Sequence, residues 1–323
     1  MKTFINKGFL RLVISIVIIG FMVFPVCNSA TINTNKIQVF KENVTIDSQE
    51  GSNDYEGASN GKEYWALLVA VGVYYNNPDA DRPSMLEAVD KLHSTLLTSP
   101  NWQADHIHVL KTSQATLFGL IRELIWLIRM EKKGDTTLIY ITTHGGRLRN
   151  KDNLPWDLPP KDENDGDDEI LVMYYGFDRW YDSITDDMLR FFLRFMQSDG
   201  LCMIIDSCFS GGFNDPIKAG ESKFIESCSA EEFTKGFLDD ISANGRVVMM
   251  SSGEEEYSYG SIFSDFISEG FNGWADLFGN NDGINSAEES FNFAYPWTVL
   301  FSEGQQHPTI VDEYSGDLAI TYN

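Results

Sequence analysis

A histidine and a cysteine occupy equivalent places in two apolar stretches of the chain. His144 follows LIYITT and precedes two glycines, and Cys208 follows MIIDS and has two glycines shortly after it. An imidazole beside a thiol is the minimal arrangement for a thiolate nucleophile, because the ring accepts the thiol proton and later delivers it to a leaving amine. Glycines leave room for a peptide and let backbone N–H groups face a developing oxyanion. Either residue alone is more often structural, but the matched pair indicates attack on a carbonyl group.

The segments that carry these residues predict a parallel sheet covered on both faces. Apolar runs of strand character alternate with amphipathic helical patterns, and the runs lie at 64–75, 106–111, 136–146, 200–208 and 246–253. This alternation is typical of a three-layer α/β/α sandwich with a mainly parallel sheet of about six strands. The carboxyl ends of parallel strands meet at one edge of the sheet. We therefore expect His144 and Cys208 to approach each other there, if their strands are neighbours.

The two motifs together resemble those of the caspase-like cysteine peptidases. LIYITTHGG and IIDSCFSGG are similar to the histidine and cysteine motifs of that family, and the form Asp-Ser-Cys-x-Ser-Gly resembles its metacaspase and prokaryotic branch. The resemblance runs from about Tyr64 to Asp312. It implies a caspase-like fold and peptide-bond hydrolysis, with Cys208 as the nucleophile, His144 as the general base and acid, and the backbone N–H groups of Gly145 and Cys208 as the oxyanion hole. It implies no cofactor for catalysis.

Two other functions remain open at this point. The chain could resemble the related asparaginyl-type cysteine peptidases, which would prefer Asn to Arg in a substrate. It could also be a catalytically inactive caspase-like binding module whose thiol is buried or bridged. The cysteines at 27, 202, 208 and 228 are too few for a disulfide framework, although a Cys202–Cys228 bridge would still leave Cys208 as a spare thiol.

A carboxylate lies close to the predicted nucleophile. Asp206 is two residues before Cys208 and points to the same side of the strand, because side chains alternate along a strand. An Asp that accepts backbone hydrogen bonds at a strand end is an equally good interpretation. In the family, the matching Asp and one that corresponds to Asp90 line the pocket for a basic residue, although Asp90 also suits a solvent-facing helix position. Two carboxylates hold a guanidinium better than an ammonium. The resemblance thus implies protein or peptide substrates with basic residues, cleaved after Arg or Lys.

An acidic segment raises the question of calcium. Residues 161–169, KDENDGDDE, place six carboxylates in nine positions. Such a run is usually a solvated loop, but a hard cation would relieve its repulsion, and oxygen ligands select calcium. In metacaspases a calcium site joins this region to a helix start and to an Asp soon after the cysteine. The resemblance implies calcium as an activator, held by Asp168, Asp186, Asp187 and Asp215, although Asp186 and Asp187 also suit a helix N-terminus.

The overall charge excludes one class of partner. The chain has 24 Lys and Arg residues against 48 Asp and Glu residues, which gives a formal net charge of −24. A nucleic-acid partner requires a basic face, which this composition cannot easily supply. Cationic peptides and metal cations are the better candidates.

The N-terminus predicts export. Within residues 1–30, three basic residues precede an apolar run from Leu12 to Val26, and small residues follow. This is the layout of a secretory signal peptide, and an uncleaved membrane anchor is the alternative, although the run is short for a span. Residues 31–62 have no sustained apolar period and predict a linker or pro-segment, and 63–323 form the peptidase domain. We therefore expect a secreted or extracytoplasmic protein with no membrane span in its mature chain.

Overall fold

The computed structural model describes the predicted peptidase domain except for several segments. The described residues are 61–150, 152, 154, 156–158, 168–208, 225–226, 234, 237–238, 240–251 and 261–323, with the side chains of residues 208, 225 and 226 excepted. The predicted signal peptide, almost all of the predicted linker, residues 161–167 and Asp215 lie outside this part of the chain.

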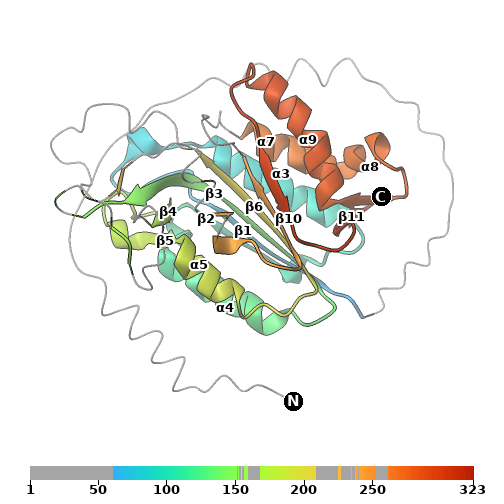
Figure 1. The fold of residues 1–323 in the computed structure, drawn as a ribbon, viewed down its shortest axis with the longest axis horizontal. Coiled ribbons are helices and arrows are strands. Elements are labelled where there is room, and N and C mark those ends of the chain that lie inside the picture. The colour runs from blue at the N-terminus through green and yellow to red at the C-terminus, as the bar shows by residue number, and fades with distance from the viewer. Residues whose placement is uncertain are drawn as a thin grey trace.

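A twisted sheet runs through the centre of the molecule (Figure 1), and its main path has the order β10-β8-β6-β3-β1-β2. These strands are β1 (Tyr64–Ala70), β2 (Ile107–Lys111), β3 (Thr136–Leu148), β6 (Gly200–Cys208), β8 (Arg246–Met250) and β10 (Thr309–Asp312). β2, β1, β3, β6 and β8 are parallel, and β10 is antiparallel to β8. The predicted parallel sheet of about six strands is therefore confirmed.

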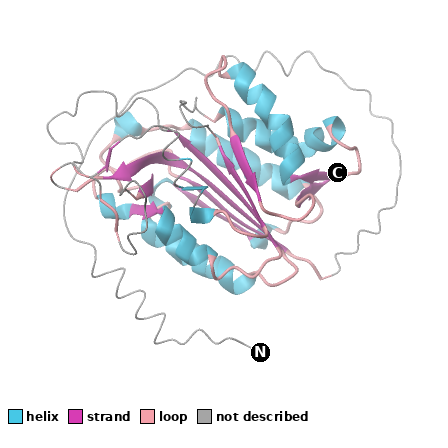
Figure 2. Cartoon of the chain, viewed as in Figure 1, coloured by secondary structure: helices cyan, strands magenta, loops and turns pink. Residues whose placement is uncertain are grey.

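Helices cover both faces of this sheet, as Figure 2 shows. The helices on one face are α3 (Ser84–Thr98), α7 (Ile262–Glu269) and α9 (Ala287–Phe301), and those on the other are α4 (Leu117–Met130) and α5 (Asp186–Leu193). The alternation of side chains along β6 explains the two cores. Met203 and Ile205 pack on the α4 side, whereas Cys202 and Ile204 pack on the α3 side. The predicted three-layer α/β/α fold is confirmed.

Short elements extend the central layers. The strands β4 (Glu169–Val172), β5 (Ser183–Thr185) and β7 (Ile225–Glu226) attach to the carboxyl-terminal part of β3, directly or through β4. A separate two-stranded sheet pairs β9 (Ile284–Ser286) with β11 (Ala319–Tyr322), and α8 (Ala275–Phe278) follows the π-helical turn η5 (Gly270–Trp274). The short 3-10 helices are η1 (Pro78–Ala80), η2 (Ala104–His106), η3 (Thr112–Gln114) and η4 (Trp180–Asp182). No helix in the described part of the chain has the length and apolarity that a bilayer crossing requires.

Candidate active site

The pairing of β3 with β6 brings the two motif residues together. The two strands are parallel and their register places position 144 opposite position 208. Neighbouring strands lie about 4.8 Å apart, so the two backbones are within side-chain reach of each other. The side chain of Cys208 lies outside the described residues, and its role as nucleophile stays a prediction. The expectation that the two strands are parallel neighbours is correct.

The ring of His144 is oriented by the loop between β1 and α3. Its Nε2 atom lies 2.8 Å from the carbonyl oxygen of Ala80, at the end of η1. A carbonyl oxygen only accepts hydrogen bonds, so Nε2 must donate and carries the proton. In the neutral ring, Nδ1 is then the basic nitrogen. The contact therefore selects the tautomer that can accept a proton at Nδ1.

A directional chain of hydrogen bonds supports the backbone of His144. Its N–H donates to Tyr74 Oη at 2.9 Å, and Tyr74 Oη lies 2.9 Å from Thr143 Oγ1. Thr143 Oγ1 donates in turn to the carbonyl of Val172. The imidazole is 2% exposed, and the rings of Tyr74 and Phe177 lie 5.2 Å and 5.7 Å from it. Both the position and the tilt of the ring are thus fixed before any substrate binds.

The backbone of Gly145 pairs with Leu171 of β4, so the glycine after the histidine lies at the start of the antiparallel extension of β3. This pairing holds the segment next to His144 in an extended conformation. The oxyanion-hole roles of the Gly145 and Cys208 N–H groups stay predictions.

Asp206 is buried, at 1% exposure, and its carboxylate contacts a side chain of α7. Tyr140 Oη donates to Ser264 Oγ at 2.7 Å, and Ser264 Oγ donates to Asp206 Oδ2. Both hydroxyl protons therefore point toward the carboxylate, which stabilises a negative charge there. Because Asp206 and Cys208 are two residues apart in one strand, their side chains leave the same face of the sheet.

Asp90 has different surroundings from Asp206. It lies on α3 with a side chain 59% exposed, and Lys111 Nζ forms an ion pair with its Oδ2 atom at 2.6 Å. Its predicted place beside Asp206 in a substrate pocket stays a prediction.

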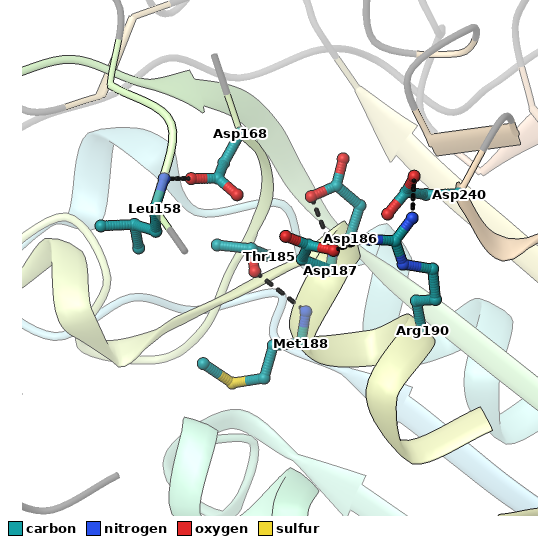
Figure 3. A network of polar contacts seen from close by, with 8 residues as sticks. All are labelled: Leu158, Asp168, Thr185, Asp186, Asp187, Met188, Arg190 and Asp240. Carbon is teal, nitrogen blue, oxygen red and sulfur yellow. Dashed lines mark hydrogen bonds and ion pairs between the residues drawn. The ribbon is translucent and has the colours of Figure 1, made fainter. Parts of the chain in front are cut away.

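Three carboxylates gather between β4 and α5. Asp168 and Asp186 have 0% exposure and Glu169 has 1%. Burial, and then the neighbouring Glu169 and Asp168, raise the pKa of Asp186 well above its usual range. The backbone N–H of Leu158 donates to Asp168 at 2.6 Å, as Figure 3 shows. The protonated form of Asp186 is therefore favoured at this site.

Asp187 belongs to a different interaction, although it follows Asp186 directly. Its carboxylate pairs with Arg190, which also pairs with Asp240 at 2.7 Å (Figure 3). Across the described ranges, no three His, Cys, Asp or Glu side chains form a group that could hold a metal ion. Because Asp215 and residues 161–167 lie outside those ranges, calcium binding stays a prediction.

Known proteins with similar sequences are metacaspases. Metacaspase-1B of Neurospora crassa is 32% identical over 136 residues, which are 41% of this chain and 29% of that protein. Metacaspase-1A of Aspergillus oryzae is 29% identical over 190 residues, which are 56% of this chain and 43% of that protein. The chain thus spans less than half the length of these curated relatives, and no protein-family model matches it.

Solved structures give the fold over most of the chain. The caspase pro-sf-caspase-1 superposes with a TM-score of 0.50 at 12% identity, over 85% of this chain and 98% of that one. This chain is related to the metacaspases and has the caspase-like fold. A structural-genomics protein from Geobacter sulfurreducens also matches with a TM-score of 0.53 at 16% identity, over 81% of this chain and 97% of that one.

Several residues that support the candidate site were not predicted. The supports of His144 are Tyr74 and the carbonyl of Ala80, and the support of Asp206 is Ser264. Tyr74 lies at the end of the apolar run that includes β1, and this position was a weak indication of a role near the site. Ser264 lies in an amphipathic helix, where the sequence gives no indication of such a role. The sequence also predicted Cys202 as a bridge candidate, but it is a buried free thiol.

Proposed function

We propose that this chain is a cysteine endopeptidase that works through Cys208 and His144. The observation that carries the proposal is the register of β3 and β6, which sets the two backbone positions opposite each other. The bond from His144 Nε2 to Ala80 supports it, because this bond leaves Nδ1 as the proton acceptor. The similarity to metacaspases points to the same reaction class.

The proposed reaction has two halves. His144 Nδ1 takes the proton of the Cys208 thiol, and the thiolate attacks the scissile carbonyl carbon while N–H groups of Gly145 and Cys208 stabilise the oxyanion. The C–N bond then breaks, and the imidazolium gives its proton to the leaving amine, which leaves a thioester on Cys208. A water molecule that His144 deprotonates attacks the thioester, and the carboxylic acid and the thiol are released.

We further propose that the enzyme cleaves after Arg, and more slowly after Lys. Asp206 is the principal support, because its carboxylate leaves the same face of β6 as position 208 and accepts from Ser264. A fixed carboxylate favours a guanidinium over a neutral side chain. Asp90 would add a weaker attraction, since an exposed charge is screened by water. An asparaginyl-type enzyme would rank Asn above Arg.

Calcium is proposed as an activator rather than a catalytic group. Asp168 and Asp186 would contribute ligands together with Asp215, which lies outside the described residues. The support for this proposal is that Asp168 and Asp186 are buried and that burial disfavours the charged form of Asp186. Calcium binds oxygen ligands and would stabilise the charged form of Asp186. Asp187 contributes less in this proposal, because it pairs with Arg190. Calcium, but not magnesium, should raise the melting temperature of the wild type, and Asp186→Asn should abolish that rise.

Export is also part of the proposal, and its support is the signal-like sequence of residues 1–30. Mass spectrometry of the protein from the culture medium should find a mature chain that begins near residue 31. A chain that keeps its N-terminus and stays with the cells would contradict export.

The activity is tested with peptides that end in Arg, Lys or Asn before a fluorescent leaving group. The wild type should release the dye fastest from the Arg peptide, and Cys208→Ala should release none. A thiol-reactive probe distinguishes the inactive binding module, because a buried or bridged Cys208 would not be labelled. Wild-type protein that neither cleaves a peptide nor reacts at Cys208 would contradict the proposal.

A further inference from the structure

A surface groove of about 330 Å³ lies between the C-terminal helices α8 and α9. Its lining consists of Phe278 of α8 together with Asn292, Phe293, Pro296, Trp297 and Leu300 of α9. Figure 1 shows these two helices side by side at the C-terminal end of the chain. Phe278 is 68% exposed and Leu300 is 63% exposed. Large apolar side chains that gather at the surface in this way mark interaction sites.

The aromatic rings around the groove hold one another in place. The ring centroid of Phe278 lies 6.0 Å from those of Trp274 and Phe293, and the ring centroids of Trp297 and Phe266 are also 6.0 Å apart. Rings that are already fixed lose little conformational freedom when a partner binds. Aromatic side chains of this kind provide much of the binding energy in protein interfaces.

The C-terminal segment that forms this groove is acidic. Residues 261–323 contain ten Asp and Glu residues and no Lys or Arg. Lys91 of α3 forms ion pairs with Asp265 and Glu269 of α7, at 2.9 Å and 3.0 Å, so a single positive charge is shared by two carboxylates. The carboxylate of Glu289 lies near the α8 end of the groove, where its Oε1 atom accepts from the N–H of Asn280 at 3.3 Å. An apolar groove in acidic surroundings favours cationic partners.

We propose that this groove binds a cationic amphipathic segment of another protein. The apolar side chains of that segment lie in the groove, and its Lys or Arg side chains face the carboxylates of the acidic C-terminal segment. A second copy of the chain fits poorly, because its own ten carboxylates would face the same ten. An anionic membrane surface fits poorly for the same reason, since it attracts basic segments.

A labelled Leu/Lys amphipathic peptide tests the proposal by fluorescence anisotropy. The protein is the full chain with Cys208→Ala, so that no cleavage complicates the titration. The matched peptide has Glu in place of every Lys. The groove variant is Phe278→Ser with Leu300→Ser, and the matched control is Phe118→Ser on α4, whose side chain is also 68% exposed. Thermal melts monitor folding of both variants.

The Lys peptide should bind, and the Glu peptide should not. The groove variant should weaken binding of the Lys peptide about tenfold or more, whereas Phe118→Ser should leave it unchanged. Added salt should also weaken it. Equal binding of both peptides, or an equal loss in both variants, would overturn the proposal. The proposal would also be overturned if the wild type self-associated in sedimentation and the groove variant did not. The same holds if the wild type bound phosphatidylserine vesicles and the groove variant did not.

Discussion

Two buried polar regions of this molecule differ in their electrostatics. At the β3–β6 edge, hydrogen-bond donors contact acceptors, whereas between β4 and α5 several carboxylates lie close to one another. The N–H of His144 donates to Tyr74, and the hydroxyl of Ser264 donates to Asp206. In contrast, burial, and then the neighbouring Glu169, raise the pKa of Asp186. The described hydrogen bonds of the first region therefore stabilise a charged Asp206, whereas the second region favours the protonated form of Asp186.

The charge of the neighbouring residue Asp187 is compensated by an arginine of the same chain. Arg190 lies between Asp187 and Asp240 and pairs with both (Figure 3). A guanidinium supplied by the chain makes that pair independent of any bound ion. The proposed catalysis at the β3–β6 edge and the proposed ion binding between β4 and α5 involve different residues, so mutations can test the two proposals separately.

The largest expected effect on activity is at the β3–β6 edge. His144→Ala should lower kcat/KM for an Arg peptide by about 10²–10⁴-fold, because the proton acceptor is lost. Steady-state release of the dye measures it. His106→Ala is the matched control, since His106 is also buried but bonds to the carbonyl of Tyr64. A His144→Ala enzyme with most of its activity would contradict the proposed role.

Asp206→Asn should change specificity more than catalysis. We expect kcat/KM for the Arg peptide to fall about 10-fold to 100-fold relative to the Asn peptide, because the carboxylate that attracts the guanidinium is removed. Asp90→Asn is the comparison, and its effect should be about threefold or less, since Asp90 is exposed. An unchanged ratio of the two substrates in Asp206→Asn would exclude the carboxylate from the pocket.

Asp186→Asn should stabilise the protein without calcium. Burial raises the folded-state pKa of Asp186 above its unfolded value, so its contribution to stability is full at acid pH and is lost as the pH rises. The melting temperature in EDTA should therefore rise by about 2–4 °C at pH 7, and the gain should shrink toward pH 4. Asp187→Asn should do the opposite at pH 7, because it breaks the pair with Arg190. A loss of stability in Asp186→Asn would show that the region is already compensated.

Tyr74→Phe should have the smallest effect. It removes the hydroxyl that accepts from His144 but keeps the ring that packs against the imidazole. Because one neutral hydrogen bond is lost, kcat/KM should fall about threefold to tenfold. A purely structural role would leave the acid limb of the pH profile of kcat/KM unchanged, whereas a positioning role should shift it. An unchanged rate and profile would remove Tyr74 from the site.

Much of the fold could be predicted because the apolar runs of the sheet strands are continuous. A strand such as β6 is buried on both faces, so its residues are almost all apolar and the run can be recognised in the sequence. The strands β4, β5 and β7 were not predicted, because two to four residues carry no period. They attach to β3 through backbone pairing, which depends little on side-chain type.

The sequence by itself determined the residue types of the site, their places at strand ends and the acidic charge of the chain. The tertiary structure alone decided the register that sets 144 opposite 208 and the partners that orient His144 and Asp206. Those partners are 70 and 58 residues away in sequence, at Tyr74 and Ser264. Hydrogen bonds act over about 3 Å and depend on direction, so they exist only after the β1–α3 loop and α7 have packed onto the sheet.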